Sequence, residues 1–368
     1  MRHYSAYLNW YIRVPHVEHD FRSSGILYFN YTLNLDKADL SVNYVHGNPE
    51  ATEALAKWYN VPNENVFISS EGASGQNARV IRFLAEKTQK KEAVVEYPTY
   101  EPLLRQAQEH FAVVKRFERK EEEGYRLDAD SLRKVVSKKT ALLLLTNPHA
   151  PSGAVSGKTE LQEITRLADE MGFFVACDEI YAEFDRSKVP TTFSINPERG
   201  ITITSFSKAY GLGGLKLGTV LTNKELVDEL YADTLNTVGN CSNIVQLATA
   251  NLLTRGKEEM EKHKQKWAPL RKEAEKWLKE KNMKYFSNSF GITYWVKTPL
   301  KDTLKWTNEH AVPRYKVTPV PGTFFLFKDG YKLEKSSMVR LGLGAVNPDG
   351  QNLLEALEAF EEAVKTGA

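Results

Sequence analysis

The sequence has few of the features that mark specialised classes of protein. Its 368 residues include only two cysteines, Cys177 and Cys241, without metal-ligand spacing, which excludes a disulfide framework and fits a reducing compartment. No apolar run approaches the length of a membrane span, and the N-terminal residues 1–4 have no apolar signal core. The formal net charge of +2 gives no electrostatic reason to expect a nucleic acid or an anionic membrane as partner. We therefore expect a soluble, cytoplasmic protein.

What the sequence does contain is an alternation of buried strands and helices. Its length favours two domains, and its contents of hydrophobic (42%) and charged (26%) residues are ordinary for a globular protein. Mainly apolar segments predict strands at 65–69, 93–96, 111–114, 141–146, 173–178 and 201–204, with helical patterns between most of them. Because these strands are mainly apolar or β-branched and are separated by helices, they predict a parallel sheet with helices on both faces. Such a sheet carries its functional site at the carboxyl ends of the strands.

The C-terminal part follows a different pattern. Residues 256–281 are highly charged, but their glutamates and lysines interleave, so a solvated helix that bridges two domains is favoured over a nucleic-acid site. Residues 1–45 show little periodicity apart from a short predicted strand at 25–29. Further strands are predicted near 291–296, 324–327 and 338–342, before a helix at 352–364. We expect an α/β protein with a three-layer αβα large domain (46–265), a smaller α+β domain (1–45 with 266–368) and the active site between them.

A lysine, Lys208, lies shortly after the predicted strand at 201–204. Residues 204–208 read Thr-Ser-Phe-Ser-Lys, and a glycine-rich loop continues to Gly218. A lysine just after a strand end, among serines and glycines, can form a Schiff base beside a phosphate pocket. Taken alone, Lys208 is better explained as a solvated loop lysine, and the neighbouring motifs change that interpretation.

Asp178 ends the apolar strand at 173–178. A carboxylate there is costly unless a cation or a hydrogen-bond donor is paired with it, and a protonated pyridine nitrogen would be such a partner. The alternative role is a helix N-cap. Tyr181 follows three residues later, where a helical turn would bring its hydroxyl toward the same pocket.

Asn147 begins the loop Asn-Pro-His-Ala-Pro-Ser-Gly after the leucine-rich strand. Its side chain offers an amide donor to an oxyanion, whereas a rigid turn explains the prolines and the glycine but gives Asn147 no role. His149, in the middle of the loop, is interpreted as structural or incidental.

Three further features carry weaker signals. Residues 72–75, Gly-Ala-Ser-Gly, are predicted to form a tight loop that begins a helix, so that the amides and the Ser74 hydroxyl could hold a phosphate without a charge. Tyr100 would lie flat on an aromatic ring or serve in core packing. Arg340 is a lone cation flanked by apolar residues on a predicted strand. It is either an edge-strand arginine or a fork that binds a substrate carboxylate.

Together these features resemble the fold-type I pyridoxal-phosphate enzymes, and specifically the class I/II aminotransferase family. The resemblance is carried by the Ser-x-Ser-Lys motif at 205–208 with its glycine-rich tail, by the loop at 147–153, by Asp-Glu-Ile-Tyr at 178–181 and by Arg340 in its short Arg-x-Gly strand. It covers about residues 45 to 345. Four motifs in the right order and at the right spacing argue against a chance match.

The resemblance implies a role toward pyridoxal 5′-phosphate for each of these residues. Lys208 would carry the cofactor as a Schiff base and later move the substrate's proton, and Asp178 would pair with the pyridine nitrogen. Asn147 and Tyr181 would bind the phenolate oxygen, and Tyr100 would stack on the ring. The phosphate would be held by small and basic residues, namely Ala73, Ser74, Ser205, Ser207 and Lys216.

The resemblance also implies an aminotransferase that works by a ping-pong mechanism between an α-amino acid and a 2-oxo acid. Arg340, with Asn147 beside it, would bind the substrate's α-carboxylate. Aspartate or glutamate is the family-level expectation for the amino acid, with aromatic amino acids or histidinol phosphate as alternatives. The family further implies a homodimer with shared active sites, in which Tyr44 resembles the tyrosine that reaches the neighbour's phosphate.

One residue departs from the family pattern, since Lys216 stands where the family usually has an arginine. Lysine keeps the charge but loses the two-pronged fork, so we expect weaker or more labile cofactor binding.

Three alternatives to an aminotransferase remain. A lyase or decarboxylase of the same fold would use the same lysine and aspartate. A dinucleotide-binding loop at 211–214 is disfavoured, because no acidic residue ends a second strand about 20 residues later. A non-catalytic, cofactor-binding sensor is disfavoured because the short N-terminal segment has no room for a DNA-binding module.

Overall fold

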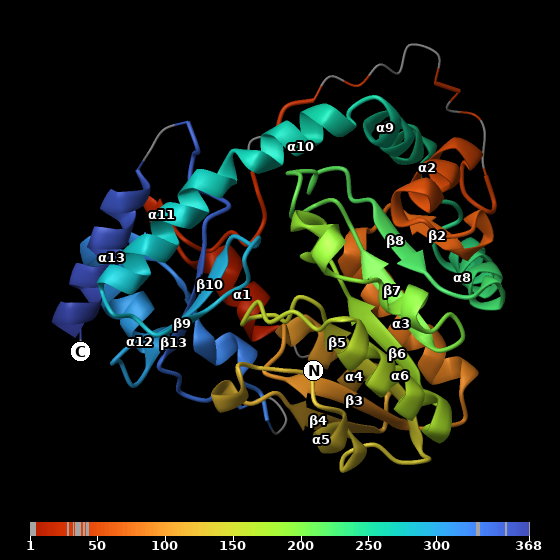
Figure 1. Cartoon of the computed structure of the whole chain (residues 1–368), viewed down its shortest axis with the longest axis horizontal. Helices are drawn as coiled ribbons and strands as arrows, with labels where there is room; N and C mark the ends of the chain where they lie inside the picture. Colours follow the sequence, from red (N-terminus) through yellow and green to blue (C-terminus); the bar gives the residue numbers. More distant parts are fainter. Residues whose placement is uncertain are drawn as a thin grey trace.

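The computed structural model describes residues 5–27, 29–31, 33, 38–39, 41, 44–328, 332–349 and 352–367. A seven-stranded sheet forms the centre of the larger part of the molecule (Figure 1), in the order β2-β8-β7-β6-β5-β3-β4. Strands β4, β3, β5, β6 and β7 are parallel to one another, and β8 is antiparallel to both of its neighbours. The strands are β2 (Val66–Ser69), β3 (Glu92–Tyr97), β4 (Val113–Glu118), β5 (Thr140–Thr146), β6 (Phe174–Asp178), β7 (Gly200–Thr204) and β8 (Gly218–Leu221).

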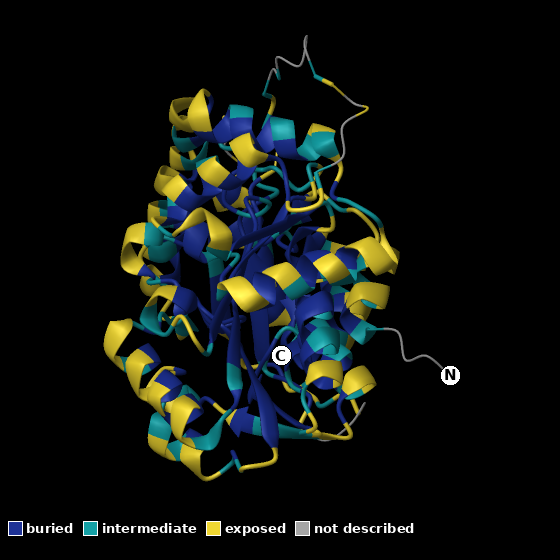
Figure 2. Cartoon of the chain, turned by 90° about the vertical axis from the view of Figure 1, so that its right-hand side faces the viewer, coloured by how far each residue is buried: buried dark blue, intermediate teal, exposed yellow. Residues whose placement is uncertain are grey.

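Helices cover both faces of this sheet, as the apolar strands predict. In β5, Leu142 and Leu144 pack with α3 and α4 on one face, whereas Leu143 and Leu145 pack with α6 on the other. Figure 2 shows the strands buried at the centre and the exposed residues on the outer sides of the helices. The helices of this part are α2 (Pro49–Tyr59), α3 (Gly72–Lys87), α4 (Glu101–His110), α5 (Ala129–Arg133), α6 (Lys158–Met171), α7 (Thr192–Ile195), α8 (Lys224–Thr237) and α9 (Asn243–Thr254). The predicted α/β fold with a mostly parallel sheet is confirmed.

A four-stranded antiparallel sheet, in the order β12-β13-β10-β9, forms the second part of the molecule. Its strands are β9 (Tyr285–Phe286), β10 (Thr293–Lys297), β12 (Val320–Pro321) and β13 (Met338–Gly342). Its helices are α10 (Lys257–Gln265), α11 (Trp267–Glu280), α12 (Thr303–Trp306), a π-helix (Thr307–Tyr315) and α13 (Leu353–Gly367). The short strand β1 (His19–Asp20) pairs with β11 (Val317–Thr318) and ties the N-terminal segment to this part.

Short 3₁₀ helices connect several of these elements, at Asn63–Asn65, Glu121–Glu123, Ala182–Phe184, Arg186–Lys188 and Gly322–Phe325. Within the described residues, no helix has both the length and the apolar character that a membrane crossing requires.

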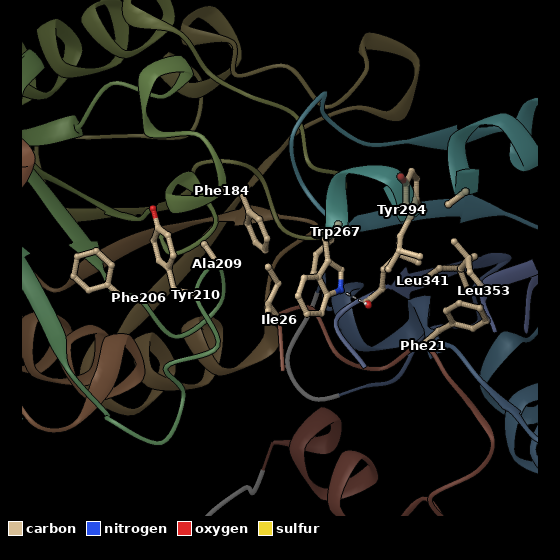
Figure 3. Close-up of a cluster of buried hydrophobic side chains, with 14 of the residues drawn as sticks. Phe21, Ile26, Phe184, Phe206, Ala209, Tyr210, Trp267, Tyr294, Leu341 and Leu353 are labelled. Atoms are coloured by element: carbon tan, nitrogen blue, oxygen red, sulfur yellow. Dashed lines mark hydrogen bonds between the residues drawn. The ribbon is translucent and has the colours of Figure 1, made fainter. Parts of the chain in front are cut away.

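One hydrophobic cluster joins the two sheets (Figure 3). Tyr210, which follows β7, packs on one side of this cluster, and Tyr294 of β10 packs on the other. Ile26 and Trp267 lie between them, and the indole Nε1 of Trp267 donates a hydrogen bond to the carbonyl oxygen of Leu343 (3.0 Å). A continuous core of this kind holds the two sheets against each other, and the N-terminal segment is part of it.

Two predicted segments near the lysine motif differ from the structure. Residues 72–75 begin a helix as predicted, but they form the first turn of α3 itself and not a loop before it. The described residues of the predicted strand at 25–29 form no strand. They lie beside the lysine loop instead, since the N–H of Ile26 donates a hydrogen bond to the carbonyl oxygen of Lys208 (2.7 Å).

Two predicted elements of the second part also differ from the structure. The predicted strand at 324–327 is wrong, because the chain turns there in a 3₁₀ helix whose last residue, Phe325, accepts a hydrogen bond from the N–H of Thr99 (3.1 Å). The charged segment 256–281 is two helices, α10 and α11, instead of one. They meet at the predicted domain boundary between 265 and 266, and the division into two domains itself stays a prediction.

Candidate active site

A cavity of about 230 Å³ lies at the carboxyl ends of β5, β6 and β7, where the sequence predicts the site. Residues predicted for the site line it, namely Ala73, Ser74, Tyr100, Asp178, Tyr181, Lys208 and Arg340. The N-terminal segment supplies another part of the wall, with Tyr7, Leu8, Tyr11, Arg22, Ser23 and Ser24. The cavity is therefore built from both parts of the molecule.

Lys208 lies shortly after β7, with its side chain partly buried in the cavity. The neighbouring N-terminal segment fits closely around it, since a Cβ at Gly25 would lie only 2.7 Å from Cδ of the lysine. Burial lowers the pKa of the Lys208 amine; the Arg340 guanidinium acts in the same direction and the Asp178 carboxylate against it. A lowered pKa increases the neutral, nucleophilic fraction of a lysine.

Asp178, the last residue of β6, is buried. Its carboxylate accepts hydrogen bonds from Nδ2 of Asn77 (2.7 Å) and from the backbone N–H of Ile180 (3.1 Å), and it forms no ion pair with another described residue. Burial raises the pKa of this carboxyl, and the two hydrogen bonds act against that shift. A buried carboxylate held only by neutral donors is suited to a cationic partner such as a protonated ring nitrogen.

Two predicted tyrosines lie in the wall of the cavity. The ring of Tyr100 meets that of Tyr7 edge-on, with 5.8 Å between the ring centroids, and burial raises the pKa of the Tyr100 hydroxyl. The hydroxyl of Tyr181 donates a hydrogen bond to Oγ of Ser24 (2.8 Å). Both tyrosines therefore lie where the sequence places them, and their contacts with a ligand stay predictions.

The N-terminus of α3 forms one end of the cavity. Its first turn contains Ala73 and the exposed Ser74. The N–H of Gly72 donates to the carbonyl oxygen of Lys216 (2.6 Å), which ties the helix to the lysine loop. A Cβ at Gly218 would lie 2.5 Å from the Gly72 carbonyl oxygen, so this close approach requires glycine. The N–H groups of a first helical turn, with a serine hydroxyl beside them, are suited to a phosphate.

Three residues predicted for the phosphate do not line the cavity. Ser205 is buried, and its hydroxyl lies 2.6 Å from that of Ser207. Lys216 has an exposed side chain and a left-handed φ of +56°, which is uncommon for a residue other than glycine. Their contacts with a phosphate stay predictions.

Asn147 is buried directly after β5, but it does not line the cavity. Its amide pairs with the backbone of Ser156, to which Nδ2 donates (2.9 Å) and from which Oδ1 accepts (2.9 Å). One N–H of Nδ2 is left for a further acceptor, so this pairing is compatible with the predicted bond to a ring oxygen. His149 is buried and bonded to Ser152 and Pro98, as a structural residue would be.

A buried ion pair supports the start of this loop. Glu96 and Arg119 are 0% and 2% exposed and lie 3.0 Å apart, and Glu96 also accepts a hydrogen bond from the N–H of Thr146 (2.7 Å). We expect Arg119→Met to lower the free energy of unfolding by about 3–5 kcal/mol, because it leaves a buried carboxylate without its cation. Urea unfolding of the purified variant measures this loss.

The matched control for this prediction is an exposed pair. Glu258 lies 2.6 Å from Lys262 on the surface of α10. Glu258→Gln is expected to change the free energy of unfolding far less than Arg119→Met does, because water screens this pair. An equal loss in Arg119→Met and Glu258→Gln would contradict the structural role of the buried pair.

Arg340 lies on β13, an inner strand between β12 and β10, so the edge-strand alternative is wrong. The residue is 3% exposed, and its Nη2 donates to the hydroxyl oxygen of Tyr7 (3.2 Å) and to the carbonyl oxygen of Arg22 (3.0 Å). Its Nε is buried and has no hydrogen-bond partner among the described residues. A buried guanidinium with an unused donor, at the wall of a cavity, is suited to a carboxylate.

Sequence reasoning missed the helix that closes the cavity. α1 (Ala6–Arg13) brings Tyr7, Leu8 and Tyr11 into the wall. A signal was present, because Tyr7, Trp10 and Tyr11 recur at helical spacing.

Asn77 and Tyr44 do not line the cavity, and each bears on the predicted site in a different way. Asn77, which bonds to Asp178, was missed, although an amide in the helical pattern that follows residues 72–75 could have suggested a buried polar contact. Tyr44, for which the family resemblance implies a place in the neighbouring subunit's site, does not line the cavity of its own chain.

Known proteins share this sequence pattern. Residues 34–360 match the family model described as aminotransferase class I and II. A histidinol-phosphate aminotransferase from Methanococcus aeolicus is 28% identical over 218 residues, which cover 59% of this chain and 57% of that protein. An aspartate aminotransferase from Pyrococcus horikoshii is 24% identical over 334 residues, which cover 87% and 82%. The chain spans about half the length of the methanococcal relatives that it matches.

Solved structures share the fold of this chain. A PLP-dependent aminotransferase from Streptococcus suis superposes with a TM-score of 0.84 at 21% identity, covering 100% of this chain and 99% of the other. The family model covers most of the chain, and the motifs around Lys208, Asp178 and Arg340 meet in one cavity. The chain therefore belongs to the aminotransferase class I and II family.

Proposed function

We propose that this chain is an aminotransferase that moves an amino group from an α-amino acid to a 2-oxo acid in two half-reactions. The observation that carries the proposal is the meeting of three groups in one cavity, the amine of Lys208, the buried carboxylate of Asp178 and the buried guanidinium of Arg340. The family match over residues 34–360 supports it.

Pyridoxal 5′-phosphate is the cofactor of this family, and when bound its ring accepts the electrons that are released at Cα of an amino acid. The residues of the cavity fit this group. Asp178 is a buried carboxylate without a cation, and the first turn of α3 offers N–H groups and the hydroxyl of Ser74 for a phosphate. Tyr100 offers an aromatic face in the same wall.

Three residues of the cavity then have distinct roles in the reaction. Arg340 binds the substrate's α-carboxylate through its guanidinium and so fixes the orientation of Cα. Lys208 takes the proton from Cα, for which its lowered pKa is an advantage because a neutral amine accepts a proton. The carboxylate of Asp178 would stabilise the positive charge on a protonated ring nitrogen of the cofactor.

A lyase or decarboxylase of the same fold would use the same lysine and aspartate. The relatives matched here are aminotransferases and give this alternative no support. The two activities differ in their need for a 2-oxo acid, since a lyase requires no acceptor.

The third cation that lines the cavity, Arg22, is fully engaged within the protein. Its Nε and Nη2 bind the carboxylate of Asp20 (2.9 and 2.5 Å). Its Nη1 donates to the carbonyl oxygens of Tyr11 and Val14 (both 3.3 Å), and its Nη2 also contacts Nδ1 of His16 (3.0 Å). Since these contacts use all five N–H groups of the guanidinium, Arg22 has no donor left for a carboxylate on a substrate side chain.

The rest of the wall next to α1 is aromatic and apolar, with Tyr7, Leu8 and Tyr11. Within the described residues of this chain, an acidic side chain would therefore meet no free guanidinium, whereas an aromatic one would pack against rings. We infer that the donor is an aromatic or apolar α-amino acid, and that aspartate or glutamate, the family-level expectation, is a poorer substrate.

Absorbance spectroscopy of the cofactor-loaded protein tests the proposal. We expect phenylalanine or tyrosine to bleach the visible band more readily than aspartate does, and a 2-oxo acid to restore it. A band that no amino acid changes would contradict amino transfer. Product release without any 2-oxo acid would favour the lyase instead.

Lys216, which stands where the family usually has an arginine, should affect the affinity for the cofactor. We expect Lys216→Arg to bind pyridoxal 5′-phosphate about fivefold more tightly, because a guanidinium can form two parallel hydrogen bonds with a phosphate. Titration of the cofactor-free protein, followed by absorbance, gives the two dissociation constants. Lys224→Arg, on the exposed surface of α8, is the control and should leave the affinity unchanged. Equal affinities in Lys216→Arg and wild type would refute the prediction.

We also propose a homodimer, in which Tyr44 reaches the phosphate of the partner's site. Family membership supports this arrangement. Sedimentation equilibrium tests the dimer, and a weaker affinity of Tyr44→Phe for the cofactor would test the shared site.

A further inference from the structure

α1 places a tyrosine against the arginine that faces the substrate. The hydroxyl oxygen of Tyr7 accepts a hydrogen bond from Nη2 of Arg340 (3.2 Å), and Tyr7 is 6% exposed. A hydroxyl that accepts a hydrogen bond keeps its own proton for a second partner. Among the described residues no acceptor for that proton is found, and Tyr7, Arg340 and Lys208 all line the same cavity. The hydroxyl proton is therefore available to a ligand in the cavity.

The ring of Tyr7 is fixed by other aromatic rings. Its centroid lies 5.8 Å from those of Tyr100 and Phe324 and 6.0 Å from that of Phe325. Rings packed at these distances and angles hold one another in place, so the hydroxyl has a defined position beside Arg340. A preorganised donor of this kind loses little entropy when it binds a ligand.

A buried carboxylate sets the position of α1 itself. Glu101 is 0% exposed. Its Oε2 accepts hydrogen bonds from the N–H of Tyr7 (2.6 Å) and from Oγ of Ser5 (2.9 Å). Its Oε1 accepts from the N–H of Ala6 (2.9 Å) and from Nε of Arg105 (2.8 Å). The first N–H groups of a helix have no partner within the helix, and an anion at that end is favourable, so Glu101 anchors the start of α1.

Glu101 is also the first residue of α4 and the neighbour of Tyr100 in the chain. One carboxylate thus connects the segment that carries Tyr100 to the helix that carries Tyr7. Neither Glu101 nor Tyr7 belongs to the motifs that indicate the family.

We propose that Tyr7 is a second ligand of the substrate's α-carboxylate, beside Arg340, and that Glu101 is a positioning residue that holds Tyr7 there through α1. The Tyr7 hydroxyl donates to one carboxylate oxygen while the guanidinium binds the carboxylate from the other side. The inference rests on the proposed function in taking an α-carboxylate as the ligand.

Calorimetric titration of the cofactor-loaded protein with 3-phenylpropionate tests the role of Tyr7. This probe has a carboxylate and an aromatic group, but it has no amino group that could react. We expect Tyr7→Phe to weaken its binding by about 10- to 100-fold, because a hydrogen bond to a charged group is lost while the ring keeps its packing. Tyr285→Phe, on β9 outside the cavity, is the matched control and should leave the affinity unchanged.

A neutral probe distinguishes carboxylate recognition from the shape of the pocket. 3-Phenylpropanamide has the same frame without the charge, so Tyr7→Phe should weaken its binding far less than that of 3-phenylpropionate. Equal weakening of both probes, or an unchanged affinity for 3-phenylpropionate, would overturn the inference.

Glu101→Gln tests the positioning role. We expect it to weaken the binding of 3-phenylpropionate in the wild-type background and to have no further effect in the Tyr7→Phe background, because Glu101 acts through Tyr7. Losses that add in the double variant would overturn the positioning role. If Glu101→Gln does not fold, Ser5→Ala removes one contact to the carboxylate and leaves its charge, and the same cycle applies.

The outcome separates this inference from the proposed function. Tyr7-dependent binding of 3-phenylpropionate in a protein that transfers no amino group would support the inference and contradict the proposed function. Full amino transfer with Tyr7-independent binding of the probe would do the reverse.

Discussion

Lys208→Ala is expected to reduce amino transfer by at least about 10⁴-fold, because it removes both the amine that would hold the cofactor and the group that would move the proton at Cα. The cavity offers no obvious substitute, since its other cations, Arg22 and Arg340, are guanidinium groups that do not lose a proton at neutral pH. The effect should appear in both half-reactions, because both need the same proton transfer.

Borohydride reduction followed by peptide mass spectrometry gives the structural readout for this variant. The wild-type protein should carry the reduced cofactor on Lys208, and Lys208→Ala should carry none. Lys276→Ala, on the exposed surface of α11, is the control and should retain both the adduct and the activity. An adduct on another lysine, or a Lys208→Ala variant that remains active, would refute the assignment of Lys208.

The part of the site that the sequence predicts is the part formed by local patterns. Asp178 ends one buried strand and Lys208 lies shortly after the next, and in a parallel sheet such strand ends meet at one edge. The alternation of strands and helices therefore brings both residues together without any knowledge of distant contacts. The same reasoning places Asn147 after β5 and Ser74 at the start of α3.

The part that the sequence does not predict depends on contacts between distant segments. Tyr7 reaches Arg340 across 333 residues, and α1 is fixed by Glu101, whose bond to the Tyr7 N–H spans 94 residues. A short amphipathic segment such as 6–13 has little helical stability alone, so its structure comes from the surface on which it packs. No pattern within residues 1–45 specifies that surface.

Local sequence patterns also do not determine which hydrogen-bond partner a polar side chain has. The sequence offers the Asn147 side chain to a ligand, whereas in the structure most of its amide is used by the backbone of Ser156. Conversely, Asn77 has no motif of its own, yet it is the side chain that bonds to Asp178. A polar side chain can satisfy its hydrogen bonds in several ways, and the packed structure selects among them.

Asp178→Asn is expected to lower the rate of amino transfer by about 10²- to 10³-fold, a loss typical of removing one preorganised electrostatic group from an active site. Asparagine has nearly the same shape but only one acceptor oxygen. Its Oδ1 can accept from the N–H of Ile180, and its Nδ2 can donate to the unpaired Oδ1 of Asn77 once that amide turns over, but it has no charge to stabilise a protonated ring nitrogen. Steady-state kinetics with saturating cofactor measures the loss. Asp185→Asn, outside the cavity, is the control and should leave the rate unchanged.

The same substitution should stabilise the cofactor-free protein. Burial raises the pKa of Asp178 in the folded chain above its unfolded value, so the ionised carboxylate opposes folding at neutral pH and this cost disappears as the pH falls toward the unfolded pKa of about 4. Urea unfolding at pH 7 should therefore show a higher free energy of unfolding for Asp178→Asn than for wild type, and the difference should shrink in acid. A variant that is both inactive and less stable at pH 7 would contradict this account, because the carboxylate would then be needed for the fold. If the variant is more stable but less active, the charge of Asp178 lowers the stability of the cofactor-free protein and its benefit lies in the interaction with the bound cofactor.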